Sequence, residues 1–147
     1  MTKKAYKLLQ LTNQDIGAVD ANSALPLGLV TRRINAPYTN CNTFVLSSGG
    51  TNTITITEPG FYKITYSASF TAGAAGDISA SLVTDGTTVY TATEAAADVG
   101  SIVNITLPYT IRVTCATPAT VPTTVQIVLG DVAITGTTSN LIIEQVQ

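Results

Sequence analysis

The residue types that could perform chemistry are few in this chain and stand far apart. Its 147 residues include no histidine and only two cysteines, Cys41 and Cys115. Without histidine, Ser-His and Cys-His nucleophilic arrangements cannot form. Zinc sites that use histidine are excluded as well, and two cysteines cannot build a four-cysteine site. We therefore expect a protein that is not an enzyme and that uses no metal and no cofactor. The cysteines read as small buried side chains, and their pairing stays open.

The carboxylates also stand singly, and most of them lie next to a residue that favours turns. They occur in the pairs Glu58-Pro59, Gly76-Asp77, Asp85-Gly86 and Gly130-Asp131. Turn formation explains an acidic residue in each of these positions. A carboxylate pair brought together by folding, as in a glycosidase, stays open at this point.

The elements that must position these residues are β-strands, and residues 58–70 give the strongest pattern. After the expected turn at Pro59-Gly60, apolar and aromatic residues alternate with polar ones. This period of two is typical of a half-buried antiparallel strand. We expect four large side chains of one face to be buried: Tyr62, Ile64, Tyr66 and Phe70.

The rest of the chain repeats this alternation between turn residues. Residues 101–115 predict a second long strand, in which Pro108 requires a bulge or a position at the sheet edge. Asp85-Gly86 predicts a tight hairpin, residues 94–98 a loop crossing, and residues 136–140 a turn before a terminal strand. With roughly eight to ten strands and no helix, the sequence indicates an all-β protein, namely a sandwich, jelly roll or barrel.

Charge is scarce and unevenly distributed. Only 11% of the residues are charged, against about 25% in an average globular protein. Up to Arg33 the chain has five basic and two acidic residues, and after it two basic and seven acidic ones. This distribution is compatible with a basic start that docks on an acidic surface, although lysines near a terminus are more often simply solvated. The acidic remainder opposes nucleic-acid binding by the rest of the chain. No apolar run approaches the roughly 18 residues of a membrane span.

Residues 18–147 resemble the TNF/C1q-like jelly roll. The resemblance lies in the order of TITITEPGFYKITYSASFT, ISASLVTDGTTV and VQIVLGDVAITGTTSNLIIEQV. Its motifs are Gly60-Phe61-Tyr62, the hairpin from Leu82 to Gly86 and the strand from Leu141 to Ile143. VDANSALPLG, which precedes Thr43 to Leu46, is similar to the family's opening strand. The variety resembled is the C-terminal domain of bacterial spore-surface (BclA-like) glycoproteins, also found in small phage virion proteins.

This resemblance implies an antiparallel β-sandwich that assembles as a homotrimer. We expect two parts: residues 1–17 as a basic N-terminal arm or first strand, and residues 18–147 as the jelly-roll domain. Candidates for the trimer interface are Phe61, Tyr109, Ile142 and Val146. Candidates for docking on a capsid are Lys3, Lys4, Lys7, Arg32 and Arg33.

Because the chain has no Gly-X-Y stalk, the resemblance favours a phage virion protein over a spore-coat protein. We expect a trimeric capsid decoration or head-fibre protein, made in the bacterial cytoplasm and located on the capsid surface. Its partners would be two further copies and a capsid or other virion protein. Two alternatives stay open: a receptor- or glycan-binding module at a fibre tip, and a bacterial spore-surface protein.

Overall fold

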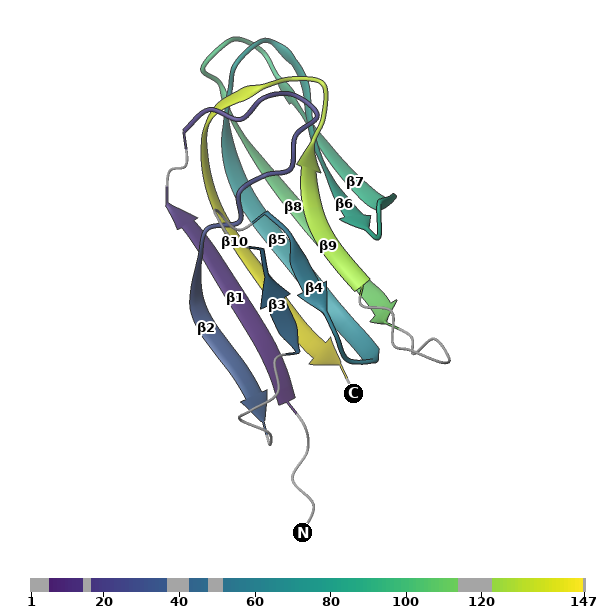
Figure 1. Cartoon of the computed structure of the whole chain (residues 1–147). Helices are drawn as coiled ribbons and strands as arrows, with labels where there is room; N and C mark the ends of the chain where they lie inside the picture. Colours follow the sequence, from purple (N-terminus) through teal and green to yellow (C-terminus); the bar gives the residue numbers. More distant parts are fainter. Residues whose placement is uncertain (1–5, 15–16, 37–42, 48–51, 114–122, 147) are drawn as a thin grey trace.

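The chain forms two antiparallel sheets packed face to face (Figure 1). A computed structural model describes residues 6–14, 17–36, 43–47, 52–113 and 123–146. Sheet A has the strand order β2-β1-β10-β5-β8, and sheet B the order β3-β4-β9-β6-β7. The strands are β1 (Tyr6–Gln14), β2 (Leu29–Ala36), β3 (Phe44–Leu46), β4 (Ile54–Ile56), β5 (Gly60–Ala72), β6 (Gly76–Thr84), β7 (Thr87–Ala96), β8 (Ile102–Val113), β9 (Thr123–Leu129) and β10 (Ile134–Val146).

The core lies between the two sheets, and β5 supplies its largest side chains. Tyr62, Ile64, Tyr66 and Phe70 are each at most 1% exposed, which confirms the face expected from alternation. β5 can bury this row because β10 and β8 pair with it on either side. Burying a large apolar side chain contributes about 1.5–3 kcal/mol, so this one strand accounts for much of the core.

Two turns depend on backbone conformations that few residues adopt. Asp85 and Gly86 both have positive φ, 49° and 79°, and they join β6 to β7 as the tight hairpin expected from the sequence. Such a two-residue turn matches the twist of its strands. Before β2, Gly28 has a φ of 93°, and a Cβ there would lie 2.2 Å from the Thr12 carbonyl oxygen. Glycine at this position lets the chain pass close to β1 and enter β2.

The strands correct three expectations for local structure and confirm a fourth. Residues 136–140 are not a turn: they belong to β10, where Thr137 and Ser139 face inward and are buried. Residues 94–98 are not wholly a loop, since β7 runs to Ala96. Pro108 lies in an edge strand, because β5 is the one described strand that pairs with β8, and it does so without a shift of register. VDANSALPLG is not a strand but makes two isolated bridges, at Val19 and Ala24.

The start of the described chain belongs to the sandwich. β1 pairs with β10 on one side and with β2 on the other, so residues 6–14 form a strand in the middle of sheet A. Residues 1–5 lie outside the described residues. β1 begins and β10 ends at the same end of the sandwich (Figure 1), which we call the terminal end; the opposite one is the loop end.

Tyr66→Phe is expected to reduce the loss of stability at alkaline pH. Burial raises the pKa of Tyr62 and of Tyr66 from 10 to about 12, and the Ser139 hydroxyl opposes this rise at Tyr66. The folded protein therefore retains phenolic protons that the unfolded chain has released. As a result, the free energy of unfolding falls as pH rises from about 10 to 12. Urea unfolding at several pH values should show a shallower fall for Tyr66→Phe. A wild-type slope for Tyr66→Phe would contradict this account.

Candidate assembly surfaces

The outer face of sheet A carries three of the four predicted trimer-interface residues. Residues directly opposite each other in a ladder share a face. Val146 pairs with Phe61, and Phe61 with Arg112, so the three side chains form one row at the terminal end. Phe61 is 51% exposed and Val146 42%, and the Arg112 guanidinium lies 5.7 Å from the centre of the Phe61 ring. Ile142 lies on the same face, half-buried, two rows further along.

Tyr109 lies on a different surface. It pairs with the core residue Ile64 and therefore points to the sheet B side of its strand. Its ring centre is 5.8 Å from that of Tyr90 on β7, so the two tyrosines form a pair where the edges of the two sheets meet. The structure thus brings Phe61, Ile142 and Val146 onto one face and places Tyr109 at the edge.

Further toward the loop end, the same outer face is neutral and hollowed. The hollow has a volume of about 380 Å³ and lies across β1, β10, β5 and β8. Its walls come from small side chains with hydroxyl or amide groups, among them Ser67, Ser69, Asn104 and Asn140. Ser69 donates a hydrogen bond to Asn104 at 2.5 Å. The lining residues include neither a charged nor an aromatic side chain.

The predicted docking residues separate into three groups. Lys3 and Lys4 lie outside the described residues. Arg32 and Arg33 are exposed on β2, the edge strand of sheet A. Lys7 is only 3% exposed, because β1 is a sheet strand and its side chain points into the sandwich. The prediction that Lys7 docks on a capsid is therefore wrong.

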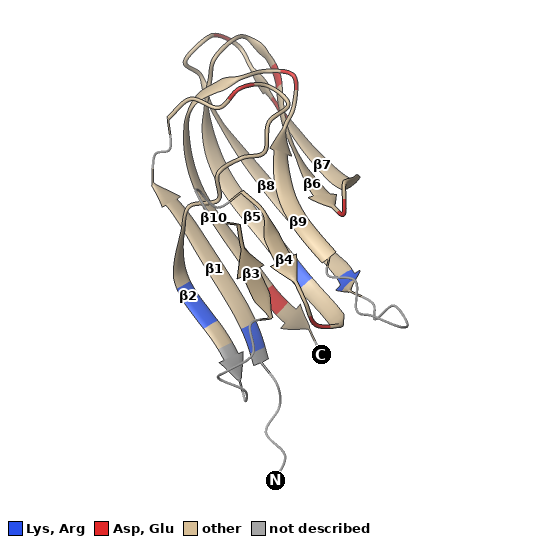
Figure 2. Cartoon of the chain, in the orientation of Figure 1, with Lys and Arg blue, Asp and Glu red and all other residues tan. Residues whose placement is uncertain are grey.

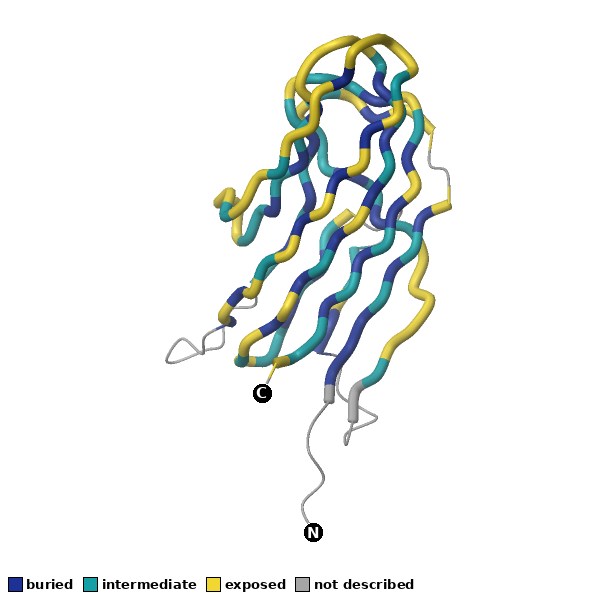
Figure 3. The backbone as a smooth tube through the Cα atoms, turned by 180° about the vertical axis from the view of Figure 1, so that it is seen from behind, coloured by how far each residue is buried: buried dark blue, intermediate teal, exposed yellow. Residues whose placement is uncertain are grey.

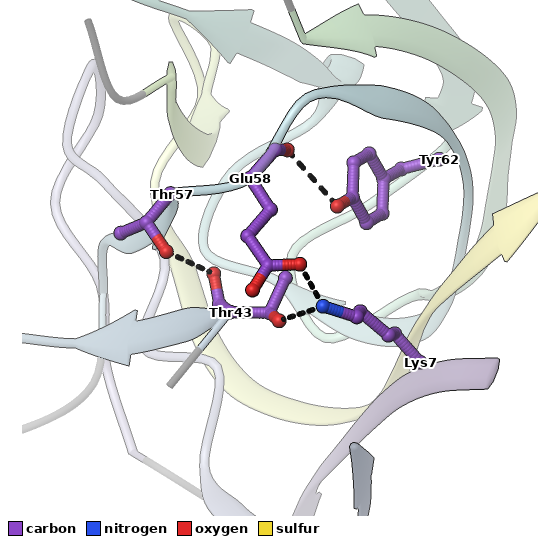
Figure 4. Close-up of polar contacts among 5 residues, drawn as sticks. All are labelled: Lys7, Thr43, Thr57, Glu58 and Tyr62. Atoms are coloured by element: carbon purple, nitrogen blue, oxygen red, sulfur yellow. Dashed lines mark hydrogen bonds and ion pairs between the residues drawn. The ribbon is translucent and has the colours of Figure 1, made fainter. Parts of the chain in front are cut away.

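Lys7 instead joins three segments inside the terminal end (Figure 4). Its ammonium group pairs with the Glu58 carboxylate and donates a hydrogen bond to Thr43 Oγ1 at 2.9 Å. Tyr62 Oη donates to the Glu58 carbonyl oxygen at 3.0 Å, which fixes the turn that carries this carboxylate. A buried ammonium group requires such compensation, since leaving water costs it several kcal/mol. These contacts tie β1, the residue before β3 and the turn before β5 together.

Charge is unevenly distributed along the length of the sandwich (Figure 2). The described basic residues lie toward the terminal end, where Glu58 pairs with Lys7 and Glu144 lies opposite Lys63. The charged residues in the described loops of the opposite end are acidic. Two basic residues beyond the predicted set, Lys63 and Arg112, are exposed on the outer face near the terminal end. The signal for them was present: both lie on the polar faces of predicted strands, and they are the only basic residues after Arg33.

The described residues give no sign of a metal site or a membrane helix. Among them, no three or more Asp, Glu, Cys or His side chains gather where they could hold a metal ion. No helix in the described part of the chain is long and apolar enough to cross a membrane. Cys41 and Cys115 lie outside the described residues, so their pairing stays a question.

Comparison with solved structures shows the TNF/C1q-like jelly-roll fold. The Eiger TNF of S. frugiperda matches with a TM-score of 0.69 at 9% identity, over 98% of this chain and 94% of that one. The globular domain of zebrafish complement 1qA matches with a TM-score of 0.65 at 10% identity, over 98% of both chains. The PRD1 vertex protein P5 matches with a TM-score of 0.59 at 13% identity, over 97% of both chains. No protein-family model matches the sequence. No curated protein matches it either.

Glu58→Gln is expected to destabilise the fold more than Lys7→Met. The first variant keeps a buried ammonium group but removes the charge that it faces, which we expect to cost about 2–4 kcal/mol. The second leaves a carboxylate that is 35% exposed and can be hydrated, so we expect about 1–2 kcal/mol. Urea unfolding at pH 7 measures both costs. The double variant should regain part of the loss from Glu58→Gln, and equal costs for the two single variants would contradict this account.

Proposed function

We propose that the protein is a non-enzymatic structural protein that assembles as a homotrimer through the outer face of sheet A. The observation that carries this proposal is the exposure of Phe61 and Val146 side by side on the outer face of sheet A. Apolar groups gathered on an exposed face mark interaction sites in soluble proteins. The low charge of the chain supports the same reading, because a surface covered by other subunits needs few charges.

We further propose that the trimer is part of a phage virion, as a capsid decoration or head-fibre protein. A phage vertex protein, PRD1 P5, is among the proteins that share its fold. The excess of basic residues at the terminal end supports attachment by that end. In a trimer whose axis runs along the strands, the three basic ends would gather at one pole and face an acidic shell. The protein would be made in the bacterial cytoplasm and act on the capsid surface.

A glycan- or receptor-binding module of a fibre tip is the second candidate, and the neutral hollow favours it. Hydroxyl and amide side chains such as Ser67, Asn104 and Asn140 can bond with sugar hydroxyls. Sugar sites commonly add an aromatic ring as a stacking platform, and the described residues that line this hollow include none. We therefore rank it below the structural role, as we do the spore-surface alternative. Specific retention of the protein on a glycan array would reverse this order.

Val146→Lys is expected to dissociate the trimer, whereas Val45→Lys is not. The two valines are matched in exposure, 42% and 45%, but Val146 lies on the outer face of sheet A and Val45 on β3 of sheet B. A lysine at position 146 would place three ammonium groups, one from each copy, within the proposed contact. Sedimentation at micromolar concentration should give a trimer for wild type and Val45→Lys, and mainly monomer for Val146→Lys. A monomeric wild type would refute the trimer.

Reversing the charge of Lys3 and Lys4 together is expected to weaken attachment to virus particles. Both residues precede β1, so the double variant Lys3→Glu/Lys4→Glu keeps the described strands intact. Co-sedimentation with particles that lack the protein should fall at least about tenfold, and the wild-type attachment should weaken with rising salt. Unchanged attachment of a folded, trimeric double variant would contradict docking by the basic start.

A further inference from the structure

The edge strand β2 is exposed in an unusual way. Five consecutive residues, from Leu29 to Arg33, are exposed, so the strand presents both of its faces as well as its free edge (Figure 3). Among the described strands, β2 makes extensive contacts with β1 alone. Leu29 is 79% exposed and Val30 39%. Within one copy, little packing holds this part of the strand, and the side chains from Leu29 to Arg33 remain in contact with water.

The other edge of the same sheet ends in aromatic rings. On β8, Tyr109 contacts Tyr90 of β7, and the Tyr90 side chain is 38% exposed. Exposed tyrosine rings are suitable partners for arginine, because a guanidinium group stacks on an aromatic face. This protein already contains one such pair within the chain, Arg112 over Phe61.

A single cross-strand row joins the two edges. It begins at Arg33 on β2 and ends at Tyr109 on β8; between them lie Leu9, Ile143 and Ile64. All five residues point to the sheet B side, since opposite residues share a face. Arg33 and Tyr109 therefore lie at the same height along the strands, on opposite edges of one copy.

We propose that Arg33 of one copy stacks on the Tyr90–Tyr109 pair of the next copy. A contact between two different surfaces closes into a ring when the rotation between copies allows it. Rotation about an axis parallel to the strands keeps every residue at its height, so the two ends of this row meet. The inference rests on the homotrimer proposed above and identifies β2 and the β7/β8 edge as its lateral contacts. In the trimer, β2 gains the packing that it lacks within one copy.

The test is a double-mutant cycle on trimer dissociation. Sedimentation equilibrium is measured over a dilution series for wild type, Arg33→Ala, Tyr90→Ala and the double variant. The concentration at which half of the trimer has dissociated should be at least about tenfold higher for each single variant than for wild type. The reason is that each variant loses three stacked pairs per trimer. The double variant should lose little more than either single one, since both remove the same contact.

Two controls separate this contact from other effects. Tyr90→Phe keeps the aromatic face and should assemble like wild type. Circular dichroism should show an unchanged strand content for all variants, because Arg33 and Tyr90 are exposed in the single copy.

The outcomes distinguish the two proposals. A wild-type protein that is monomeric throughout overturns the trimer and this contact together. A trimeric wild type whose Arg33→Ala and Tyr90→Ala variants dissociate like wild type overturns the contact and leaves the trimer standing. Fully additive effects of the two variants would show that Arg33 and Tyr90 act separately, which also overturns the contact.

Discussion

The antiparallel pairing of β10 with β5 is the constraint on which the other features depend. Its ladder runs from Ile134 opposite Ala72 to Val146 opposite Phe61. Because side chains alternate with a period of two, this register decides for both strands which residues face the core. A slip by one residue would expose Tyr62 and Tyr66 and turn Phe61 inward. The same register continues into β1 and β8, and it thereby sets the rows that reach both edges of sheet A.

Alternation made the strands of the core predictable, and it also limited what could be predicted. The buried face of β5 and the Asp85-Gly86 hairpin follow from local rules, since polarity and turn chemistry carry the information. Residues 136–140 misled those rules because glycine, threonine and serine also favour turns. There the long ladder with β5 overrides local preference, and Thr137 and Ser139 are buried as strand residues. Pairing with a neighbouring strand outweighs local turn preference in such positions.

Lys7 shows why a candidate site is harder to predict than a fold. Three lysines near a chain start suggest a solvated basic segment, yet only the strand register decides that Lys7 points inward. The sequence places its partner Glu58 in a turn but does not predict the ion pair. The turn brings the Glu58 carboxylate next to the Lys7 ammonium group. A pair 51 positions apart in the sequence leaves no local pattern. The exposed arginines of β2, by contrast, lie in a strand that no sheet covers, and their exposure agrees with the expectation from charge.

The two edges of sheet A also constrain how copies can meet. An exposed edge strand invites another chain to extend the sheet, and arginine or proline on that edge opposes it. β2 carries Arg32 and Arg33, and β8 carries Pro108, which has no N–H to offer to a further strand. Extension of the sheet through backbone hydrogen bonds is therefore disfavoured on both sides. Contacts between copies must then use side chains, such as the outer-face row at Phe61 and the rings at the β7/β8 edge. Side-chain contacts between unlike surfaces can close into a small ring, whereas strand addition would continue into a fibre.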